Sequence, residues 1–285
     1  MSDHRQNRRS PGPTLVGVEL NLTDRVAVVT GGSKGIGLAT ARTLRAEGAY
    51  VVVASRKSSP ELDALAGPGL VHVPADLTDP DAPAAVVAHA SDVFGGLDIL
   101  VNNAGGPPPG ASLPRFSFLP LTDADWREMF EFNLFSAVRT ARAAIPVMVE
   151  RGGGVIVNVS SAVARQPGAM NADYAAAKAA LTNLTKALSE EFAPQGVRVN
   201  AVSPGPVRTP WWTDEGGAAD VLAAAFGADR NAVLERVAPE AMALRTGRLL
   251  DPQEVADVIA LLASPRSAST TGADVVVDGG FHKGV

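Results

Sequence analysis

One tyrosine and one lysine in this sequence have the spacing of a proton-transfer pair. Tyr174 and Lys178 are four residues apart in Tyr-Ala-Ala-Ala-Lys, and on a helix this spacing puts both side chains on one face. A free phenol has a pKa of about 10 and is a poor base at neutral pH, whereas a nearby ammonium group favours the phenolate and lowers that pKa. The pair therefore predicts acid–base chemistry at Tyr174, tuned by Lys178. An incidental pair on an amphipathic helix is the alternative.

Serine and asparagine side chains could complete this chemistry. Ser160 and Ser161 follow a Val/Ile-rich run at residues 155–159, and ligands bind beyond the carboxyl ends of such strands. A capping or turn role is the alternative for either serine. Asn133 lies inside an otherwise apolar helical stretch, where a polar amide needs a hydrogen-bonding partner. That partner is either part of a functional site or a local backbone group.

A glycine-rich segment follows the first apolar run. The sequence from Thr30 to Gly37 reads Thr-Gly-Gly-Ser-Lys-Gly-Ile-Gly and leads into a helical pattern. Glycines let the backbone approach a pyrophosphate closely, and the N-terminus of the helix offers it unpaired N–H groups. The segment therefore predicts a dinucleotide-binding loop, with a plain strand-to-helix turn as the alternative.

Apolar runs alternate with helical patterns along the chain, and these elements must position the polar groups. Most of the apolar runs are unbroken and rich in Val and Ile, which is typical of parallel strands buried on both faces. The expected strands are residues 26–30, 50–54, 70–74, 97–101, 155–159, 197–202 and 274–277. The expected helices are residues 36–47, 82–94, 123–150, 172–192 and 252–263. The alternation predicts a doubly wound α/β fold with helices on both faces of a parallel sheet.

The composition excludes several classes of protein and site. There is no cysteine, which excludes disulfides, thiolate metal sites and cysteine nucleophiles. The net charge is −5 and no long basic stripe is present, so we expect no nucleic-acid partner. No apolar run is long enough to cross a membrane. The histidines lack metal-ligand spacing, so we expect no metal site and interpret them as surface or loop residues. They are His4, His72, His89 and His282.

The beginning of the chain differs in composition from the rest. Arg8 and Arg9 suggest a twin-arginine export signal, but the segment that follows is short, contains Glu19 and lacks a small-residue cleavage site. We therefore expect residues 1–21 to be a flexible leader and the protein to be cytoplasmic. Residues 22–285 are expected to form a single domain.

Taken in order, these motifs resemble the classical short-chain dehydrogenase/reductase family, and the resemblance covers about residues 22–280. Besides the glycine-rich loop, the matching motifs are Asn102-Asn103-Ala104-Gly105, Asn133, Ser161, Tyr174, Lys178, Pro204-Gly205 and Val277-Asp278-Gly279-Gly280. The overall pattern looks most similar to 3-oxoacyl-carrier-protein reductase-like members. The resemblance implies a seven-stranded Rossmann fold and a nicotinamide-dependent oxidoreductase.

The resemblance also implies a role for each matching residue. The implied catalytic residues are Asn133, Ser161, Tyr174 and Lys178, and the thirteen-residue spacing to the tyrosine favours Ser161 over Ser160. In the family the asparagine holds a water that links the lysine to solvent. The implied cofactor contacts are Gly31, Ser33, Lys34, Gly35, Ile36, Gly37, Ser55, Arg56, Asp76, Leu77, Asn103, Ala104, Gly105, Tyr174, Lys178, Pro204, Gly205, Val207 and Thr209. A turn role is the alternative for Asp76.

The charges after the second strand indicate which nicotinamide cofactor is preferred. NAD-dependent enzymes usually place an acid there, on the ribose 2′-hydroxyl. Here the strand ends in Ser55-Arg56-Lys57, and no acid occurs before Glu61. Arg56 and Lys34 could instead bind a 2′-phosphate, as similar residues do in NADP-preferring members of the family. We therefore predict NADP(H), with NAD(H) as the alternative cofactor and ordinary solvated charges as the alternative for both residues.

The implied reaction is hydride transfer between the nicotinamide and a small carbonyl or secondary alcohol substrate. The alternative is a non-catalytic cofactor sensor or interaction protein on the same fold. The family implies a homotetramer or homodimer.

Two stretches interrupt the alternation of strands and helices: the Pro/Gly-rich residues 105–121, which include Pro107-Pro108-Pro109, and the excursion at residues 204–248. Trp211 and Trp212 in the excursion are interpreted either as a substrate lid or as packing residues.

Overall fold

A computed structural model of the chain describes residues 19–108, 115 and 117–284. Within them, seven parallel strands form one sheet in the order β3-β2-β1-β4-β5-β6-β7. The strands are β1 (Val26–Thr30), β2 (Tyr50–Ser55), β3 (Leu70–Pro74), β4 (Ile99–Asn102), β5 (Gly154–Val159), β6 (Val197–Pro204) and β7 (Asp274–Val277). The predicted doubly wound sheet is confirmed. The fourth strand begins two residues later than predicted, at Ile99 instead of residue 97.

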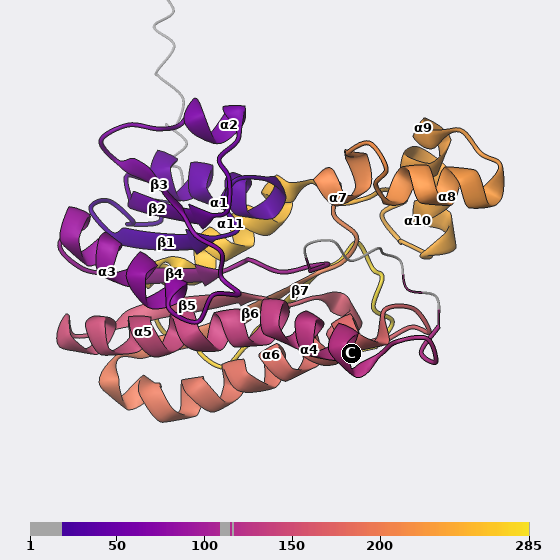
Figure 1. Cartoon of the computed structure of the whole chain (residues 1–285). Helices are drawn as coiled ribbons and strands as arrows, with labels where there is room; N and C mark the ends of the chain where they lie inside the picture. Colours follow the sequence, from indigo (N-terminus) through magenta and orange to yellow (C-terminus); the bar gives the residue numbers. More distant parts are fainter. Residues whose placement is uncertain (1–18, 109–114, 116, 285) are drawn as a thin grey trace, which may run out of the picture.

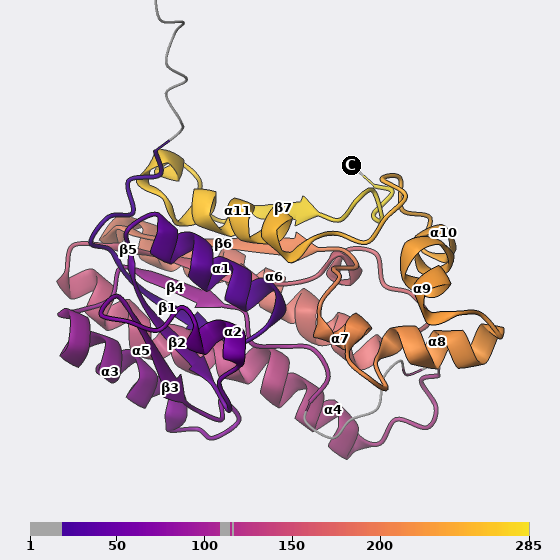
Figure 2. The same ribbon diagram turned by 90° about the horizontal axis from the view of Figure 1, so that it is seen from above.

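Helices cover both faces of the sheet (Figures 1 and 2). On one face, α1 (Gly35–Ala46) packs against α11 (Pro252–Ala263), and the short α2 (Pro60–Asp63) lies near them. On the other face, α3 (Ala82–Phe94) packs against α5 (Ser136–Glu150), next to α6 (Ala172–Phe192). This arrangement explains why the strands read as unbroken apolar runs, because each side chain of a central strand meets a helix on one face or the other.

The sheet has a hydrophobic core on each face, and successive side chains of β1 alternate between these two cores. Val26 and Val28 pack with α3 and α5, whereas Ala27 and Val29 pack with α1 and α11. All five residues of β1 are buried. Successive side chains of a strand point to opposite faces, so two separate hydrophobic cores hold this strand in place. Its carboxyl end, where the glycine-rich loop begins, is therefore rigidly positioned.

The predicted helix at residues 123–150 has the expected ends but is not α-helical throughout. It begins as α4 (Asp123–Phe130), passes through a π-helical turn at Glu131–Phe135 and continues as α5. A capping box between Thr122 and Asp125 starts α4, since each side chain accepts a hydrogen bond from the other's backbone N–H. π-Helical turns occur frequently at functional sites, and this one contains Asn133.

The excursion at residues 204–248 folds into a small helical unit, which Figure 1 shows beside the carboxyl ends of the strands. Its helices are α7 (Pro210–Thr213), α8 (Ala218–Phe226), α9 (Arg230–Ala232) and α10 (Ala238–Ala241). The unit has its own apolar cluster, in which Trp212 is 2% exposed and packs with Val233 and Leu234. The rings of Trp211 and Trp212 meet edge to face. Both tryptophans belong to this cluster, which favours the packing interpretation. None of these helices was expected from the sequence.

The structure leaves some expectations untested. Most of the predicted leader, residues 1–18, lies outside the described residues, as does Pro109 of the proline run. In the part of the chain that is described, no helix is long and apolar enough to cross a membrane.

Candidate active site

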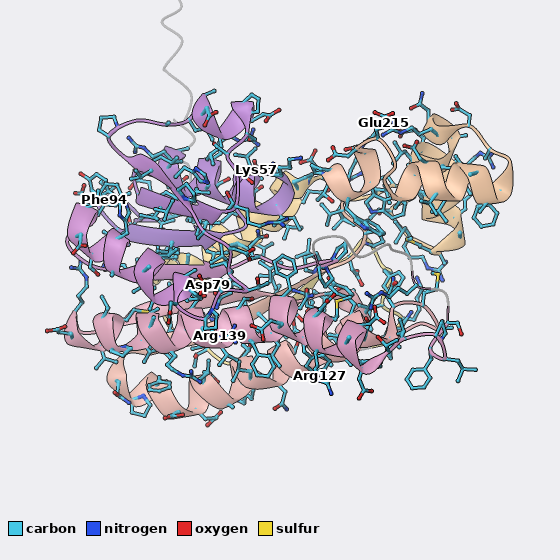
Figure 3. The ribbon with its side chains drawn as sticks, viewed as in Figure 1. Lys57, Asp79, Phe94, Arg127, Arg139 and Glu215 are labelled. Atoms are coloured by element: carbon cyan, nitrogen blue, oxygen red, sulfur yellow. The ribbon has the colours of Figure 1, made fainter. Side chains whose placement is uncertain are left out.

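The predicted site residues converge on the carboxyl ends of the central strands. The glycine-rich loop follows β1, Asn103 to Gly105 follow β4, Ser161 follows β5 and Gly205 follows β6. In Figure 3, two labelled residues mark the two ends of the strands. Lys57 follows β2 and lies toward the carboxyl ends, from which α7 extends, whereas Phe94 ends α3 and lies toward the amino ends. The strand order reverses between β1 and β4, and such a point is where open parallel sheets bind ligands.

Tyr174 and Lys178 lie one turn apart near the start of α6. The Lys178 side chain is buried, with 2% of the residue exposed. Its Nζ donates a hydrogen bond to the carbonyl of Val159 at 2.9 Å and lies 5.8 Å from the centroid of the Tyr174 ring. The carbonyl at the end of β5 thus fixes the ammonium group beside the phenol.

Burial changes the acidity of both groups. Desolvation lowers the pKa of Lys178 from 10.5 to about 8. Desolvation also raises the pKa of Tyr174 above its ordinary value, and a hydrogen bond with Ser161 opposes that rise. Desolvation is the largest cause of the Tyr174 shift, and it acts against the lowering of the phenol pKa that is expected from Lys178. The Tyr174 phenol therefore keeps its proton at neutral pH, and Lys178 is largely but not fully protonated.

The structure separates the two candidate serines. Ser160 is buried, and its hydroxyl donates to the carbonyl of Lys178 at 3.0 Å and pairs with Thr182. Ser161 is partly exposed, and its interaction with the phenol lowers the pKa of Tyr174 against the effect of desolvation. It also accepts a long hydrogen bond from the backbone of Val163. The hydroxyl of Ser160 is thus occupied within the protein, and Ser161 is the serine that faces the phenol.

Asn133 is fully buried beside the segment that follows β4. Its Nδ2 donates to the carbonyls of Gly106 and Met129 at 2.8 and 3.0 Å, and its Oδ1 accepts from Gly106 N at 2.8 Å. These backbone partners satisfy the amide, as the local alternative expected. Asn133 nevertheless borders the site, because a Cβ added at Gly105 would lie 2.9 Å from its Oδ1 and 2.7 Å from Lys178 Nζ.

The close approach at Gly105 leads to a prediction. We expect Gly105→Ala to lower kcat/KM by roughly 10- to 100-fold, because the added methyl group must displace Lys178 Nζ or the Asn133 amide, and a displacement of about 1 Å is enough for such a loss. Steady-state kinetics checks this. Gly95→Ala is a control for glycine replacement, since a Cβ there meets nothing within 4 Å, although its left-handed φ of 82° disfavours alanine. Activity in Gly105→Ala equal to that of the parent would contradict the placement of the two groups.

The glycine-rich loop is tied to the turn after β4. Gly31 has a φ of 64°, and a Cβ there would lie 2.9 Å from Ala104 Cα. Asn103 Nδ2 donates to the carbonyls of Thr30 and Gly31 at 2.9 and 3.1 Å. The Thr30 hydroxyl in turn accepts from the backbone N–H groups of Asn103 and Ala104, each at 3.0 Å. The two segments predicted to contact the cofactor thus form one cross-linked surface.

The cations predicted to bind a 2′-phosphate occupy different environments. Lys34 directly precedes α1, and its Nζ lies 3.3 Å from Asp214 Oδ2, with both side chains more than half exposed. Arg56 is exposed beyond the end of β2 and forms no ion pair within the part of the chain that the structure describes. Asp214 follows α7, so this ion pair joins the glycine-rich loop to the small helical unit. The sequence did not reveal this partner for Lys34.

Hydrogen bonds at the ends of β2 and β3 hold the residues near Arg56 in place. The Ser55 hydroxyl donates to the carbonyl of Lys57 at 2.9 Å and lies 3.0 Å from His72 Nε2. The interpretation of His72 as a surface or loop residue is wrong, because it belongs to β3 and is half-buried.

Asp76, beyond β3, forms a local turn. Its Oδ1 accepts hydrogen bonds from the backbone N–H and the hydroxyl of Thr78, which lowers the Asp76 pKa. The turn role considered for Asp76 is therefore present, and Leu77 beside it is buried.

The segment after β6 completes the site. A Cβ at Gly205 would lie 2.7 Å from Asp278 Cα, so the C-terminal motif packs directly on this glycine. Val207 is buried and pairs with Leu250. The Thr209 side chain would lie 3.1 Å from a Cβ on Gly35, which brings the start of α7 against the glycine-rich loop.

The comparisons with known proteins agree with this geometry. Residues 31–282 match a family model described as enoyl-(acyl carrier protein) reductase. The chain is 39% identical to cis-4-hydroxycyclohexanecarboxylate dehydrogenase from Sinomonas cyclohexanicum, over 90% of this chain and 96% of that one. It is 36% identical to 3-oxoacyl-[acyl-carrier-protein] reductase FabG from Vibrio cholerae, over 92% and 99%. Its fold matches L-sorbose reductase from Gluconobacter frateurii, solved with NADPH and L-sorbose, with a TM-score of 0.84, 33% identity and coverage of 94% and 100%.

Proposed function

The chain belongs to the short-chain dehydrogenase/reductase family, and from this premise we propose that it is an NADP(H)-dependent oxidoreductase that interconverts a carbonyl and a secondary alcohol with Tyr174 as the acid and base. The observation that carries the proposal is the buried Lys178 ammonium, whose Nζ lies 5.8 Å from the centroid of the Tyr174 ring, with Ser161 acting on the acidity of the same phenol. The relatives support this reaction class, since they are named as a dehydrogenase of a hydroxy acid and as reductases of an oxoacyl group and of L-sorbose.

The residues that would hold the cofactor suit a dinucleotide phosphate. Gly31 and Gly37 leave no room for side chains, because a Cβ would lie 2.9 Å from Ala104 Cα and 2.4 Å from Asn103 Nδ2, so the loop needs both glycines to pack on the turn after β4. The unpaired N–H groups at the start of α1 suit a pyrophosphate. Lys34, before α1, and Arg56, after β2, supply positive charge suited to a 2′-phosphate. Bound there, the nicotinamide supplies or accepts the hydride.

The protein's own residues would manage the proton and the substrate oxygen. Tyr174 donates its hydroxyl proton to the oxygen of a carbonyl as that oxygen gains negative charge, and its raised pKa keeps the proton available at neutral pH. Ser161 donates a hydrogen bond to the same oxygen and orients it. Lys178 stabilises the tyrosinate that remains, and Asn133 holds Gly106, in the segment after β4, through its side-chain amide. In the oxidation direction each proton moves the opposite way.

A substrate screen tests this function directly. The purified protein is mixed with simple ketones, diketones and quinones, and the absorbance of the reduced nicotinamide is followed with NADPH and with NADH. We expect NADPH oxidation with at least one carbonyl compound. Tight NADPH binding without turnover of any compound would overturn the proposal and favour a cofactor-sensing protein.

The cofactor preference gives a second prediction. We expect Lys34→Ala and Arg56→Ala each to raise the KM for NADPH by roughly 10-fold or more while leaving the KM for NADH unchanged, because a hydrogen bond to a charged group contributes about 1.5–3 kcal/mol. Asp214→Asn should lower the KM for NADPH, because it removes the carboxylate that competes for Lys34. Steady-state kinetics with both cofactors measures these effects.

A distant lysine provides the control for this experiment. Lys186 is an exposed residue of α6 that pairs with Glu190, and Lys186→Ala should change neither KM. A parent protein that uses NADH as well as or better than NADPH would contradict the preference.

We also propose that residues 22–285 act as one catalytic domain and that the chain assembles into dimers or tetramers through the helices that carry Asn133 and Tyr174.

A further inference from the structure

We propose that Arg115 and Asp173 form a buried ion pair that positions Tyr174 by fastening Arg115 and the start of α4 to the first turn of α6. The proposal rests on the function proposed above, and it adds two positioning residues that the motifs of the sequence do not identify. Neither side chain is expected to touch the reacting atoms.

Burial is the first observation that supports this ion pair. Arg115 NH1 contacts Asp173 Oδ2, and the side chains of the two residues are 9% and 0% exposed. Asp173 directly precedes Tyr174, and its Oδ1 accepts a hydrogen bond from Tyr174 N at 2.9 Å. A carboxylate in the first turn of a helix is stabilised by the helix dipole, and the guanidinium supplies the opposite charge that burial requires.

The backbone of Arg115 is attached to the same helix end. Arg115 N donates to Asn171 Oδ1 at 2.7 Å, and Asn171 N donates to the carbonyl of Arg115 at 2.9 Å. Asn171 precedes α6 with a φ of 55°, a left-handed conformation that asparagine tolerates better than most residues. Both the backbone and the side chain of Arg115 are therefore fastened to the residues just before Tyr174.

The same guanidinium reaches a second helix. Arg115 NH2 lies 3.3 Å from Asp125 Oδ1, and Asp125 forms the capping box that starts α4. α4 leads into the π-helical turn that contains Asn133, and this turn packs against α6. One side chain thus connects the starts of the two helices that carry Asn133, Tyr174 and Lys178.

An arginine suits this position because its donors have a fixed planar arrangement. Its two terminal nitrogens here face carboxylates from two different helices, and this requires a definite orientation of each helix. Buried ion pairs are a weak source of stability compared with apolar packing. The geometry therefore points to orientation of the catalytic helix, rather than stability, as the main effect of the pair.

The test compares Asp173→Asn with a matched control at the amino end of β4, opposite the carboxyl ends of the strands. Asparagine keeps the shape and the acceptor for Tyr174 N but removes the charge. We expect kcat/KM for the carbonyl substrate to fall roughly 10- to 100-fold, while the Kd of NADPH, measured by fluorescence, stays within about twofold of the parent value. Arg115→Gln should lose at least as much, because it leaves the Asp173 carboxylate buried and unpaired. The double variant should recover part of that loss.

Asp98 provides the control. It is 6% exposed, accepts a hydrogen bond from Val26 N at 2.8 Å and contacts Arg25 and Arg151 at 3.2 and 3.5 Å. Asp98→Asn should lower the melting temperature without changing kcat/KM. If Asp173→Asn behaves in the same way, with a lower melting temperature and unchanged kcat/KM, the ion pair has only a structural role and the proposal is overturned.

A second measurement tests the positioning without any turnover. Tyr50 and Tyr174 are the chain's two tyrosines, and Tyr50 stacks on Phe94 far from the site, so Tyr50→Phe leaves Tyr174 as the single tyrosine. In that background the ring-carbon NMR signal of Tyr174 should shift or broaden beyond its linewidth in Asp173→Asn and stay unchanged in Asp98→Asn. An unchanged signal in Asp173→Asn would refute the positioning role. A parent protein that reduces no carbonyl refutes only the proposed function, because this signal can still be compared.

Discussion

Replacing Tyr174 with phenylalanine is expected to lower kcat for carbonyl reduction by about 10³-fold, which is within the usual contribution of general acid–base catalysis. The substitution removes the hydroxyl that Ser161 contacts and keeps the ring that lies beside Lys178 Nζ. The proton for the developing alkoxide must then come from water. Steady-state kinetics with NADPH and the best carbonyl substrate of the screen measures this loss.

Two controls accompany this variant. The Kd of NADPH and the melting temperature should stay close to the parent values, because the phenyl ring preserves the packing of the site. Tyr50→Phe changes the other tyrosine, which stacks on Phe94 with a centroid distance of 5.0 Å, and should retain full activity. Turnover of Tyr174→Phe within a few-fold of the parent would refute Tyr174 as the proton donor.

Replacing Lys178 with methionine is expected to have the second largest effect, a loss of roughly 10²-fold in kcat/KM or more. Methionine fills a similar volume in a position that is 2% exposed, but it cannot stabilise the tyrosinate or donate to the carbonyl of Val159. The loss should therefore come from the missing charge and hydrogen bonds rather than from a cavity. Circular dichroism of the variant checks that the fold is retained.

The pH dependence of the parent protein tests the same lysine. Burial lowers the pKa of Lys178 from 10.5 to about 8, so the ammonium is present below about pH 8 and is lost above it. Tyr174 keeps its proton through this range because its pKa is raised. The rate of reduction should therefore fall as pH rises through about 8 in the parent. The residual rate of Lys178→Met should show no such decline, and a parent rate that is constant up to pH 10 would contradict the role of the lysine charge.

Local sequence patterns were sufficient to predict the sheet and its main helices. The Val-rich runs of β1, β2 and β5 have no polar face, so only a parallel sheet covered on both sides can bury them. The helix expected from residue 252 begins there, and its cap is local, since the side chain of Asp251 accepts a hydrogen bond from the backbone of Gln253 before α11. The Tyr174–Lys178 pair was predictable because helical geometry alone puts residues four apart on the same face.

Features that depend on distant partners could not be predicted in this way. The spacing to Tyr174 favoured Ser161 over Ser160, but only the packing of α6 on β5 shows the physical difference, because it occupies the hydroxyl of Ser160 with the carbonyl of Lys178. The direction of the Tyr174 pKa shift also depended on burial that the spacing does not reveal. The helices of residues 204–248 stabilise one another through a cluster around Trp212, and their polar contacts with the body of the domain include Lys34–Asp214.

The sequence alone thus determined which residues share a helix face and which strand ends meet at one edge of the sheet, because short-range geometry and the burial of apolar runs decide both. Tertiary structure alone decided which polar groups pair across the chain and how far each is desolvated. Asp173 illustrates the difference, since in the sequence it is an ordinary acid at a helix start. In the folded protein it is fully buried and paired with Arg115, which lies 58 positions earlier in the chain.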